Sequence, residues 1–441
     1  MNILHYNLGV PPLRSGGLTK YSIDLAIEQS KENNVYILYP GGEDIFLKKD
    51  RIVNEHDYKG IECYKIKNSL PISLLLGVKE PKTFLRKYKK LEIKKFFISK
   101  KIEIFHVHTF MGLSKEFLEV AKDLKIKIIY TTHDYFGLCP KVNLMDYKFN
   151  VCKDFKGGKK CVICNYYSPT TFKLNLLSMG VHKVYKKLKA FFNFKIQLER
   201  SNINISKIEE IESKSLDYFE LREDFLEKIF LVDNIHYNSN LTKRIYEKYI
   251  ANKNGEVILI AHNSLKKMGI IDKKYSSKIR IGFFGTPQKI KGFDYLYEEV
   301  EKIEEKLKSK IEIHVFGIER EYAKKYESNN FIFNGKYKQE ELVEIYKKID
   351  YTIVPSIWWE TFNLVSLESK FYETPIIISN KVGAKEIFLE EEKIEFLTEP
   401  DNLKKILENL INKKIEKKIS EKLDNNIWNE HVKKVEKLYK V

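Results

Sequence analysis

Short apolar runs alternate with amphipathic stretches along this chain, and one segment shows the pattern most clearly. Residues 351–354 form an apolar run that a proline ends, and Leu364, Leu367 and Phe371 then recur at helical spacing. A short apolar run before a proline is typical of a buried strand, and the later spacing is typical of a helix. Asn363 is a residue type that favours the N-cap position. The segment therefore predicts strand, loop and helix in succession.

The same alternation extends over most of the sequence. It predicts strands at residues 2–8, 34–39, 104–108, 126–131, 235–239, 278–285, 311–317, 331–335 and 373–379. It predicts helices at residues 18–26, 87–97, 166–200, 201–228, 338–346, 403–411 and 428–439. Strands that alternate with helices are typical of α/β folds with parallel sheets. A chain of 441 residues is long enough for two such domains.

The pattern also suggests where the domains lie. We expect a first Rossmann-like domain over residues 1–245, with a helical insertion at 166–228. A second Rossmann-like domain is expected over residues 246–422, followed by a C-terminal helix over 423–441. The segment 235–239 is expected to be the last strand of the first domain.

The composition favours anionic partners. Lys and Arg number 78 and Asp and Glu number 61, so the formal net charge is +17. Phosphates, an anionic membrane surface or nucleic acid could use this charge. The lysines are spread along the chain and no nucleic-acid-reading motif is present, so we expect no nucleic-acid partner.

Two basic stretches carry interleaved apolar residues, at 87–97 and 176–192. Each fits a core helix with a lysine face, and each also fits a helix lying on an anionic membrane surface. No apolar run approaches the ~20 residues that cross a bilayer. The first residues lack a charged region followed by an apolar one. We expect a cytoplasmic protein, with contact to the inner face of the membrane as one hypothesis.

Two glycine-containing loops follow predicted strands. Gly16 and Gly17 follow the first strand, and Gly285 ends the strand at 278–285. Glycine allows the backbone to approach a ligand closely at a helix N-terminus, although a plain turn also explains Gly16-Gly17. After Gly285 come Thr286 and Lys291, and a lysine before a helix can neutralise a diphosphate.

Two carboxylates lie close to the predicted helix that starts near Asn363. Glu360 is in the preceding loop and Glu368 is on the helix. A helix N-terminus suits a phosphate, and carboxylates can accept hydrogen bonds from sugar hydroxyls. These parts describe a pocket for a nucleotide that carries a sugar. Two ordinary surface acids are the alternative interpretation.

His133 directly follows the predicted strand at 126–131, and ligands of doubly wound sheets bind at such strand ends. A structural histidine is the alternative. His106 and His108 end the strand at 104–108, and we do not predict a metal there.

Four cysteines follow within a short stretch. Cys139, Cys152, Cys161 and Cys164 could supply four thiolates to one structural zinc ion. Unligated thiols in a reducing compartment are the alternative.

Several of these segments resemble one known family. The segment 353–368 resembles the Glu-x7-Glu motif of the retaining glycosyltransferases of family 4. The Gly16-Gly17 loop and the sequence around His133 are similar to segments of the same family. The family pattern Gly-Arg-x4-Lys-Gly is matched at Gly285 and Lys291, but Thr286 replaces the arginine. Lys289 or another basic residue could substitute for that missing cation.

The resemblance implies the GT-B fold, in which two Rossmann-like domains face each other across a cleft and the last helix crosses back to the first domain. It implies that Glu368 binds the donor ribose and that Glu360 contacts the donor sugar and β-phosphate. Lys291 and the backbone N–H groups around Phe362, Asn363 and Leu364 would stabilise the leaving diphosphate.

By the same resemblance, Gly16, Gly17, Gly285 and Thr286 would border the donor, and His133 would contact the transferred sugar. No metal is required for catalysis. A subset of the family carries a similar cysteine cluster.

The implied activity is retaining transfer of a hexose from a nucleotide sugar to an acceptor hydroxyl. The acceptor would be a glycan, a lipid-linked molecule or a protein-linked molecule, in glycan, polysaccharide or glycolipid synthesis. A catalytically idle relative that binds a nucleotide or glycan is the alternative, because the arginine is missing.

Overall fold

The structure is a computed structural model that divides into two compact units. Unit 1 comprises Met1–Asn238, Lys243–Ile258 and Val432–Val441, and unit 2 comprises Ser239–Thr242 and Leu259–His431. The residues described are 1–14, 16–42, 49–178, 211–251, 253–263, 276–285, 288–318, 326, 328–413, 415–421, 423 and 426–440.

Unit 1 is built on a sheet with the strand order β3-β4-β2-β1-β5-β6-β7-β8. The strands are β1 (Asn2–Tyr6), β2 (Asn34–Pro40), β3 (Arg51–Tyr58), β4 (Ile61–Lys67), β5 (Ile104–Val107), β6 (Lys127–Thr131), β7 (Asn234–Tyr237) and β8 (Gly255–Val257). All neighbours are parallel except β3, which pairs antiparallel with β4. The chain moves outward from β1 through β2 and then returns to β5 on the other side of β1. This reversal places a topological switch point between β1 and β5, where α/β proteins bind ligands.

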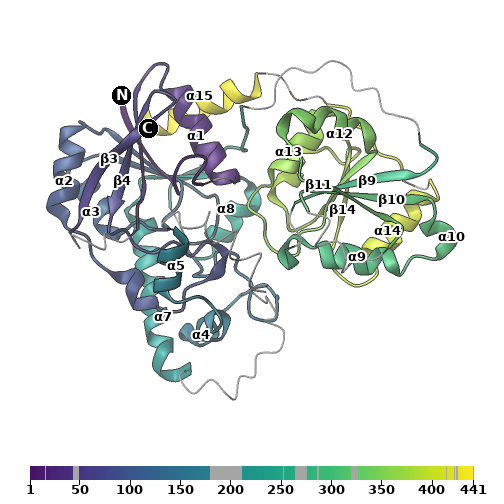
Figure 1. Ribbon diagram of the computed structural model, residues 1–441, viewed down its shortest axis with the longest axis horizontal. Coiled ribbons are helices and arrows are strands. Elements are labelled where there is room, and N and C mark those ends of the chain that lie inside the picture. Colours follow the sequence, from purple (N-terminus) through teal and green to yellow (C-terminus); the bar gives the residue numbers. More distant parts are fainter. Residues whose placement is uncertain are drawn as a thin grey trace. The chain divides into compact units, whose positions relative to one another are not determined.

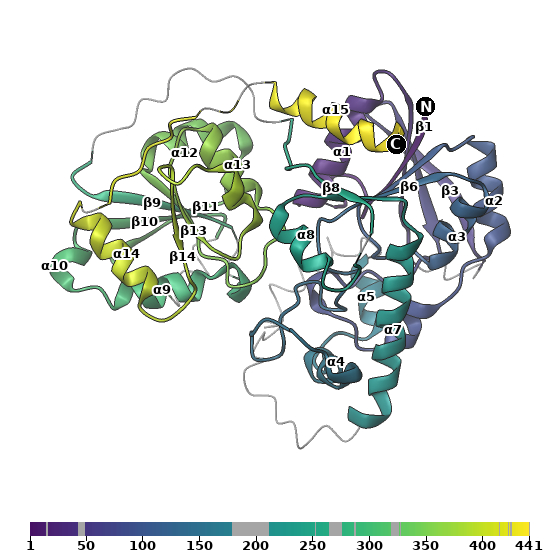
Figure 2. The ribbon, with the colours of Figure 1, turned by 180° about the vertical axis from the view of Figure 1, so that it is seen from behind.

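Helices and short 3-10 turns surround the sheet of unit 1, and two of the helices, α8 and α15, also have residues in unit 2. The helices are α1 (Gly17–Gln29), α2 (Lys90–Ser99), α3 (Lys115–Asp123), α4 (Lys159–Asn165), α5 (Thr171–Ser178), α7 (Ile211–Leu231), α8 (Asn240–Tyr246) and α15 (Ile427–Lys440), with the 3-10 turns η1 (Leu74–Leu76), η2 (Pro81–Leu85) and η3 (Lys156–Gly158). The last helix, α15, lies beside α1 in both views (Figures 1 and 2), where Gln29 Nε2 donates to the Tyr439 hydroxyl at 3.1 Å.

Unit 2 is built on a parallel sheet with the strand order β11-β10-β9-β12-β13-β14. The strands are β9 (Ile279–Phe284), β10 (Ile311–Phe316), β11 (Phe331–Gly335), β12 (Tyr351–Val354), β13 (Ile376–Ser379) and β14 (Lys393–Phe396). Here the order reverses between β9 and β12, which is the second switch point of the chain.

Helices cover both faces of the second sheet (Figure 1). They are α9 (Phe293–Glu301), α10 (Glu305–Lys308), α12 (Leu342–Lys348), α13 (Leu364–Phe371) and α14 (Asn402–Ile411), with the 3-10 turns η5 (Lys289–Lys291), η6 (Gln339–Glu341) and η7 (Gly383–Ile387). One face packs on α9 and α14 through buried residues such as Leu296 and Leu407. The other face packs on α12 through Leu342 and Tyr346. The resulting core holds the ends of β9 and β12 in place.

The predicted α/β architecture is confirmed, and so are several elements. Strands β11 and β12 have the bounds that the apolar runs predict, and α13 begins at Leu364. Asn363 caps α13, because its side-chain oxygen accepts from Ser366 N at 2.9 Å.

One strand prediction is wrong. The segment 235–239 is not the last strand of unit 1, because β8 follows and pairs parallel with β7. With only three residues, Gly255-Glu-Val257, β8 is too short to show an apolar pattern. Strand β3 escaped prediction because it is polar and lies at the edge of its sheet.

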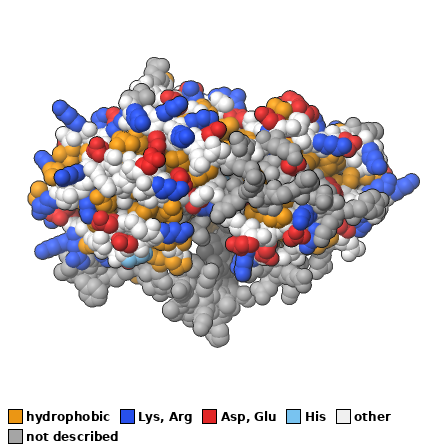
Figure 3. All heavy atoms as spheres, turned by 90° about the horizontal axis from the view of Figure 1, so that it is seen from above, with side chains coloured by type: hydrophobic (Ala, Val, Ile, Leu, Met, Phe, Trp, Pro, Cys, Tyr) orange, Lys and Arg blue, Asp and Glu red, His pale blue; other side chains and the backbone are white. Residues whose placement is uncertain are grey.

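The basic stretch at 87–97 forms most of α2. This helix buries Ile93, Phe96 and Phe97 and exposes Lys94 and Lys95, as a core helix with a lysine face does. Most of the second stretch, residues 179–192, lies outside the described residues. Within the described part of the chain, no helix is long and apolar enough to cross a membrane. On the face shown in Figure 3, Lys and Arg side chains are interspersed with acidic and hydrophobic groups.

Candidate functional site

The second switch point brings together two of the residues that the sequence singles out. Lys291 ends η5, in the connection after β9, and Glu360 lies in the connection after β12. The Lys291 ammonium donates to Oε1 of Glu360 and lies 5.6 Å from the centre of the Trp358 ring. Because β9 and β12 are parallel neighbours, their carboxyl ends deliver this cation and this anion to the same edge of the sheet.

The Glu360 carboxylate is fixed by more than its ion pair. Only 6% of Glu360 is exposed, and its second oxygen accepts a hydrogen bond from the Ser356 hydroxyl. Its backbone bridges to the connection after β13, since Glu360 N donates to Lys381 O and Gly383 N donates to Glu360 O, both at 2.9 Å. A buried carboxylate with these contacts is a preorganised acceptor with a fixed orientation.

Glycine is required directly after Lys291. Gly292 has φ +76°, and a Cβ atom there would lie 1.7 Å from the carbonyl oxygen of Pro355. The close approach of these two backbones fixes Lys291 against the β12 connection. Gly285 has φ +142° with open space where a Cβ would be. Thr286, which the sequence places in the site, lies outside the described residues.

The helix α13 presents its N-terminus after this loop. Phe362 is buried and its carbonyl accepts from Ala384 N at 3.1 Å, whereas Asn363 and Leu364 are partly exposed. Asn363 has φ +106°, a conformation that is uncommon outside glycine and that clusters at functional sites.

Glu368 lies one turn further along α13 and is 13% exposed at its side chain. Its Oε1 is 3.8 Å from Nε2 of the buried His262. Burial, and then the Glu368 carboxylate, raises the pKa of Tyr372 to about 12, so this phenol keeps its proton at neutral pH. Glu368 is therefore a partly exposed acceptor near a phenol that keeps its proton.

In unit 1, His133 lies directly after β6, at the carboxyl end of the strand, and is half-buried. Its Nε2 is 3.3 Å from Nδ1 of His108, and its ring lies edge-on to Tyr21 with centroids 4.9 Å apart. Burial, and then the neighbouring His236, lowers the pKa of His133 to about 3. The ring is therefore neutral at neutral pH.

His133 belongs to a group of histidines on four parallel strands and their ends: His5, His106, His108, His133 and His236. All except His133 are fully buried. Burial lowers the pKa of His5 and of His236 to about 4 each. Burial, and then the neighbouring histidine rings, lower the pKa of His108 well below its usual range. Ligand nitrogens of His5, His106 and His108 lie within 4.8 Å of one another.

The glycines of the first loop also lie at a switch point. Gly16, with φ +129°, is the N-cap of α1, and Gly17 is the first residue of that helix. Both are exposed, and no atom lies within 4 Å of a Cβ built at Gly16. A ligand can approach the backbone closely here.

The four clustered cysteines lie in one region of unit 1 and are free thiols. Burial raises the pKa of Cys161, the Arg222 guanidinium lowers it, and the thiols of Cys139, Cys164 and Cys152 raise it again, so the four groups are neighbours. Burial likewise raises the pKa of Cys164 to about 12.

The spacing of these sulfurs is wider than in a closed zinc site. Among the described residues, no three cysteine sulfurs all lie within 4.8 Å of one another. Zn–S bonds of about 2.3 Å would place the sulfurs of a tetrahedral site about 3.8 Å apart. Zinc binding would therefore require the thiols to move together.

Sequence reasoning missed several residues of these sites. Ser356 and His262 contact the two glutamates, and Gln29 and Tyr439 contact the histidines. Ser356 follows β12 closely and lies four residues before Glu360, so its place in the sequence could have indicated its contact with Glu360. Tyr439 gave none, because 333 positions separate it from His106.

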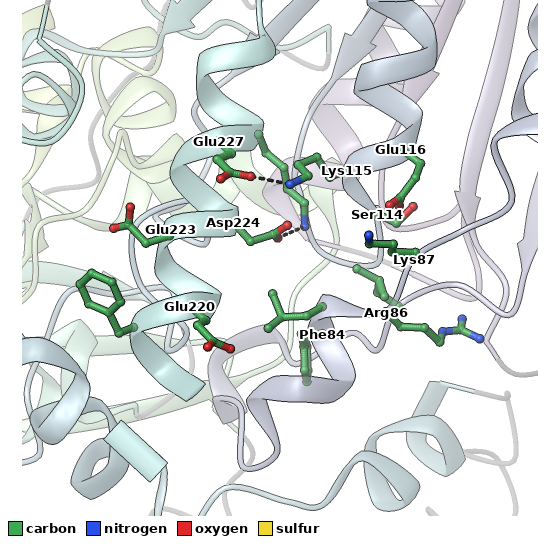
Figure 4. Close-up of a pocket in the computed structure, with 14 residues that line it drawn as sticks. Phe84, Arg86, Lys87, Ser114, Lys115, Glu116, Glu220, Glu223, Asp224 and Glu227 are labelled. Atoms are coloured by element: carbon green, nitrogen blue, oxygen red, sulfur yellow. Dashed lines mark hydrogen bonds and ion pairs between the residues drawn. The ribbon is translucent and has the colours of Figure 1, made fainter. Parts of the chain in front are cut away.

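A separate hollow of about 340 Å³ lies beside α7 (Figure 4). Acidic residues of α7 line one side of it, and two of them pair with lysines, Glu227 with Lys115 and Asp224 with Lys228. None of the site residues predicted from the sequence lines this hollow. Four of its charged side chains are paired with one another in this way, and we assign the hollow no ligand.

Comparison with known proteins gives a family for part of the chain. Residues 270–430 match the family described as "Glycosyl transferases group 1". A stretch of 111 residues is 31% identical to an uncharacterized 41.2 kDa protein of the Klebsiella pneumoniae cps region and covers 25% of this chain and 30% of that protein. A stretch of 114 residues is 31% identical to an uncharacterized glycosyltransferase of Methanocaldococcus jannaschii and covers 25% of this chain and 29% of that protein. The matches thus span less than a third of either relative.

The fold is similar to solved structures over nearly the whole chain. Sucrose-phosphate synthase from Thermosynechococcus elongatus has a TM-score of 0.57 at 13% identity, covering 99% of this chain and 98% of that one. Anabaena HepE in complex with UDP has a TM-score of 0.54 at 13% identity, covering 100% and 96%. WaaG, a glycosyltransferase involved in lipopolysaccharide biosynthesis, has a TM-score of 0.53 at 10% identity, covering 100% and 95%. These likenesses show the GT-B fold of two Rossmann-like domains.

Proposed function

Because residues 270–430 form a glycosyl transferases group 1 domain, we propose that the protein is a glycosyltransferase that uses a nucleotide-sugar donor. The observation that carries the proposal is the Lys291–Glu360 pair at the switch point of unit 2. Of the similar structures, Anabaena HepE is complexed with UDP in one and with UDP and glucose in another. A nucleotide sugar supplies the phosphates that such a lysine recognises.

Unit 2 supplies the groups that donor chemistry requires. Negative charge develops on the leaving diphosphate as the bond to the sugar breaks, and Lys291 and the N-terminus of α13 stabilise that charge. Glu360, held by Ser356, accepts hydrogen bonds from the donor sugar. Glu368 accepts hydrogen bonds from the ribose hydroxyls. In unit 1, His133 contacts the transferred sugar.

The transfer is proposed to retain the anomeric configuration of a hexose and to proceed without a catalytic metal. The acceptor is a hydroxyl of a glycan or of a lipid- or protein-linked molecule. The site of action is the cytoplasm, at the inner face of the membrane where the acceptor is lipid-linked. We also propose a structural zinc on Cys139, Cys152, Cys161 and Cys164, supported by their grouping in one region.

Calorimetric titration with a panel of nucleoside diphosphates and nucleotide sugars tests the donor assignment. Micromolar binding of one base, followed by transfer of its sugar with retained configuration, is the expected result. Binding without any turnover would instead favour an idle nucleotide-binding relative. Binding of no member of the panel would contradict the donor assignment of Lys291, Glu360 and Glu368 together.

A further inference from the structure

The histidines of unit 1 form one continuous hydrogen-bonded chain, and its direction can be read from one end. His236 Nε2 lies 2.7 Å from the carbonyl oxygen of Ile258. A carbonyl oxygen can only accept, so Nε2 of His236 carries the proton. The ring is neutral, which leaves Nδ1 of His236 as an acceptor. The Thr131 hydroxyl, 3.0 Å away, therefore donates its proton to that nitrogen.

The next links follow from the single proton of each hydroxyl. Thr131 has given its proton to His236, so Nε2 of His106, at 2.7 Å, must donate to the Thr131 oxygen. Nδ1 of His106 is then an acceptor, and it receives the Tyr439 proton at 2.7 Å. The Tyr439 oxygen in turn accepts from Nε2 of Gln29 at 3.1 Å. Gln29 Oε1 also lies 3.4 Å from the Tyr439 oxygen, but it receives no proton from Tyr439, because the single hydroxyl proton is directed at His106. This fixes the orientation of the Gln29 amide.

The last links reach the proposed sugar-contacting residue. With its nitrogen turned to Tyr439, Gln29 offers its oxygen to His5, whose Nε2 donates at 2.9 Å. His5 Nδ1 then accepts from Nε2 of His108 at 3.0 Å, and His108 Nδ1 accepts from Nε2 of His133 at 3.3 Å. One proton placement thus satisfies every link from Ile258 to His133.

This arrangement also bears on the short distances between His5, His106 and His108. A metal ion needs an unprotonated nitrogen directed at it from each ligand. Both ring nitrogens of each of these three histidines already have a protein partner in the chain of hydrogen bonds. The geometry favours a hydrogen-bonded chain over a metal centre.

We propose that Gln29 and Tyr439 are positioning residues that transmit the direction of hydrogen bonding and so hold His133 as the Nε2–H tautomer. Nδ1 of His133 then carries a lone pair, and a ligand group can meet that nitrogen only by donating. A sugar hydroxyl can donate in this way, whereas a carbonyl or a phosphate oxygen cannot. The inference rests on the proposed function only in taking His133 as the residue that meets the sugar.

The direction of these hydrogen bonds depends on an uninterrupted series of them from His133 to the carbonyl oxygen of Ile258. Without the Tyr439 hydroxyl, the Gln29 amide can turn over and donate to His5. His5 and His108 then reverse their hydrogen bonds, and His133 takes its proton on Nδ1. Replacing Thr131 by valine removes the hydroxyl that joins His106 to His236. The hydrogen bonds from His106 to His133 can then reverse in the same way.

The tautomer is measured by nitrogen NMR on the full-length protein labelled with ¹⁵N-histidine at neutral pH, in which the signal lost in His133→Asn identifies His133. The native protein is expected to show a neutral His133 with its proton on Nε2. Tyr439→Phe and Thr131→Val should each convert a substantial fraction of His133 to the Nδ1–H form. Tyr6→Phe is the matched control. It removes another buried hydroxyl, which donates to Met111 O and takes no part in the hydrogen bonds that connect Ile258 to His133.

A native His133 protonated on Nδ1 or on both nitrogens would overturn the inference. So would an unchanged tautomer in both Tyr439→Phe and Thr131→Val, or the same change in Tyr6→Phe. The measurement needs no substrate. If no sugar transfer is found but the tautomers behave as described, the proposed function fails and the positioning role stands.

Discussion

The Lys291 ammonium pairs with the Glu360 carboxylate although 69 positions separate the two residues. They meet because β9 and β12 are neighbours in the sheet while β10 and β11 extend it on the other side of β9. The cation that is proposed to stabilise the leaving diphosphate is thus held by an acidic group until the donor phosphates compete for it.

Lys291→Met should lower sugar transfer strongly. Removing one preorganised donor to a developing negative charge costs roughly 10²–10³-fold in kcat in comparable sites. Transfer or slow hydrolysis of the preferred nucleotide sugar measures the effect. Lys306→Met, which removes an exposed lysine from α10 of the same unit, is the control and should retain native turnover. Native kcat in Lys291→Met would contradict the assignment.

Glu368→Ala should abolish nucleotide binding, because the pocket loses its proposed acceptor for the ribose hydroxyls. Calorimetric titration with the preferred nucleoside diphosphate measures the loss. The matched variant Glu340→Ala removes an exposed acid elsewhere in unit 2 and should bind normally. Unchanged affinity in Glu368→Ala would remove this residue from the site.

Gly292→Ala should destabilise unit 2 severely. The new Cβ would lie 1.7 Å from the Pro355 carbonyl oxygen at a φ of +76°, so the β12 connection must shift. We expect a loss of more than about 3 kcal/mol in the free energy of unfolding, measured by denaturant titration. Gly335→Ala has nearly the same φ, +78°, with nothing within 4 Å, and should lose only about 1–2 kcal/mol. Equal losses in the two variants would show that the close approach to Pro355 is unimportant.

The histidine chain should make unit 1 sensitive to acid. His5 and His236 have folded-state pKa values of about 4, below the ordinary value of 6.5, so the unfolded chain binds more protons between these pH values. Stability is therefore fully present above pH 6.5 and is lost as the pH falls towards about 4. Each histidine contributes up to about 1.4 kcal/mol per pH unit in this window. Asp134, whose pKa burial raises to about 6, acts in the opposite direction.

Denaturant titrations at several pH values measure this slope. His5→Asn should reduce the slope, whereas His56→Asn, which replaces an exposed histidine on β3, should leave it unchanged. Stability that is independent of pH between 6.5 and 4 would contradict the burial of neutral rings.

The cysteine proposal is tested by metal analysis of the purified protein. One zinc per chain is expected, with loss of the metal in Cys161→Ser. Cys63→Ser, which removes the buried thiol of β4, should keep it. Protein that contains no zinc and whose four clustered thiols titrate freely would exclude the site.

Much of unit 2 could be predicted from sequence because the physical contrasts there are strong. The run from Tyr351 to Val354 is buried on both faces, as the strands of a parallel sheet are, and Asn363 caps the helix that follows. The order of the strands is harder to predict, since no local sequence pattern indicates that β9 lies beside β12. The motif around Glu360 and Glu368 compensated for this.

The histidine chain could not be predicted in the same way. His106 and His108 were noticeable at a strand end, but His5 and His236 occur singly within apolar strands, where a buried histidine has no characteristic neighbours. Gln29 and Tyr439 contact each other across 410 positions. Contacts of this kind depend on the return of α15 to unit 1, which only the tertiary structure specifies.

That return also affects the order in which the protein can fold during synthesis. Val432–Val441 belongs to unit 1 although all of unit 2 from Leu259 precedes it in the chain. A ribosome therefore synthesises all of unit 2 before it adds Tyr439, whose hydroxyl joins Gln29 to His106. Until then the nascent first unit has its sheet but lacks the Tyr439 hydroxyl between Gln29 and His106. An expression fragment that stops at Ile258 would remain in that incomplete state.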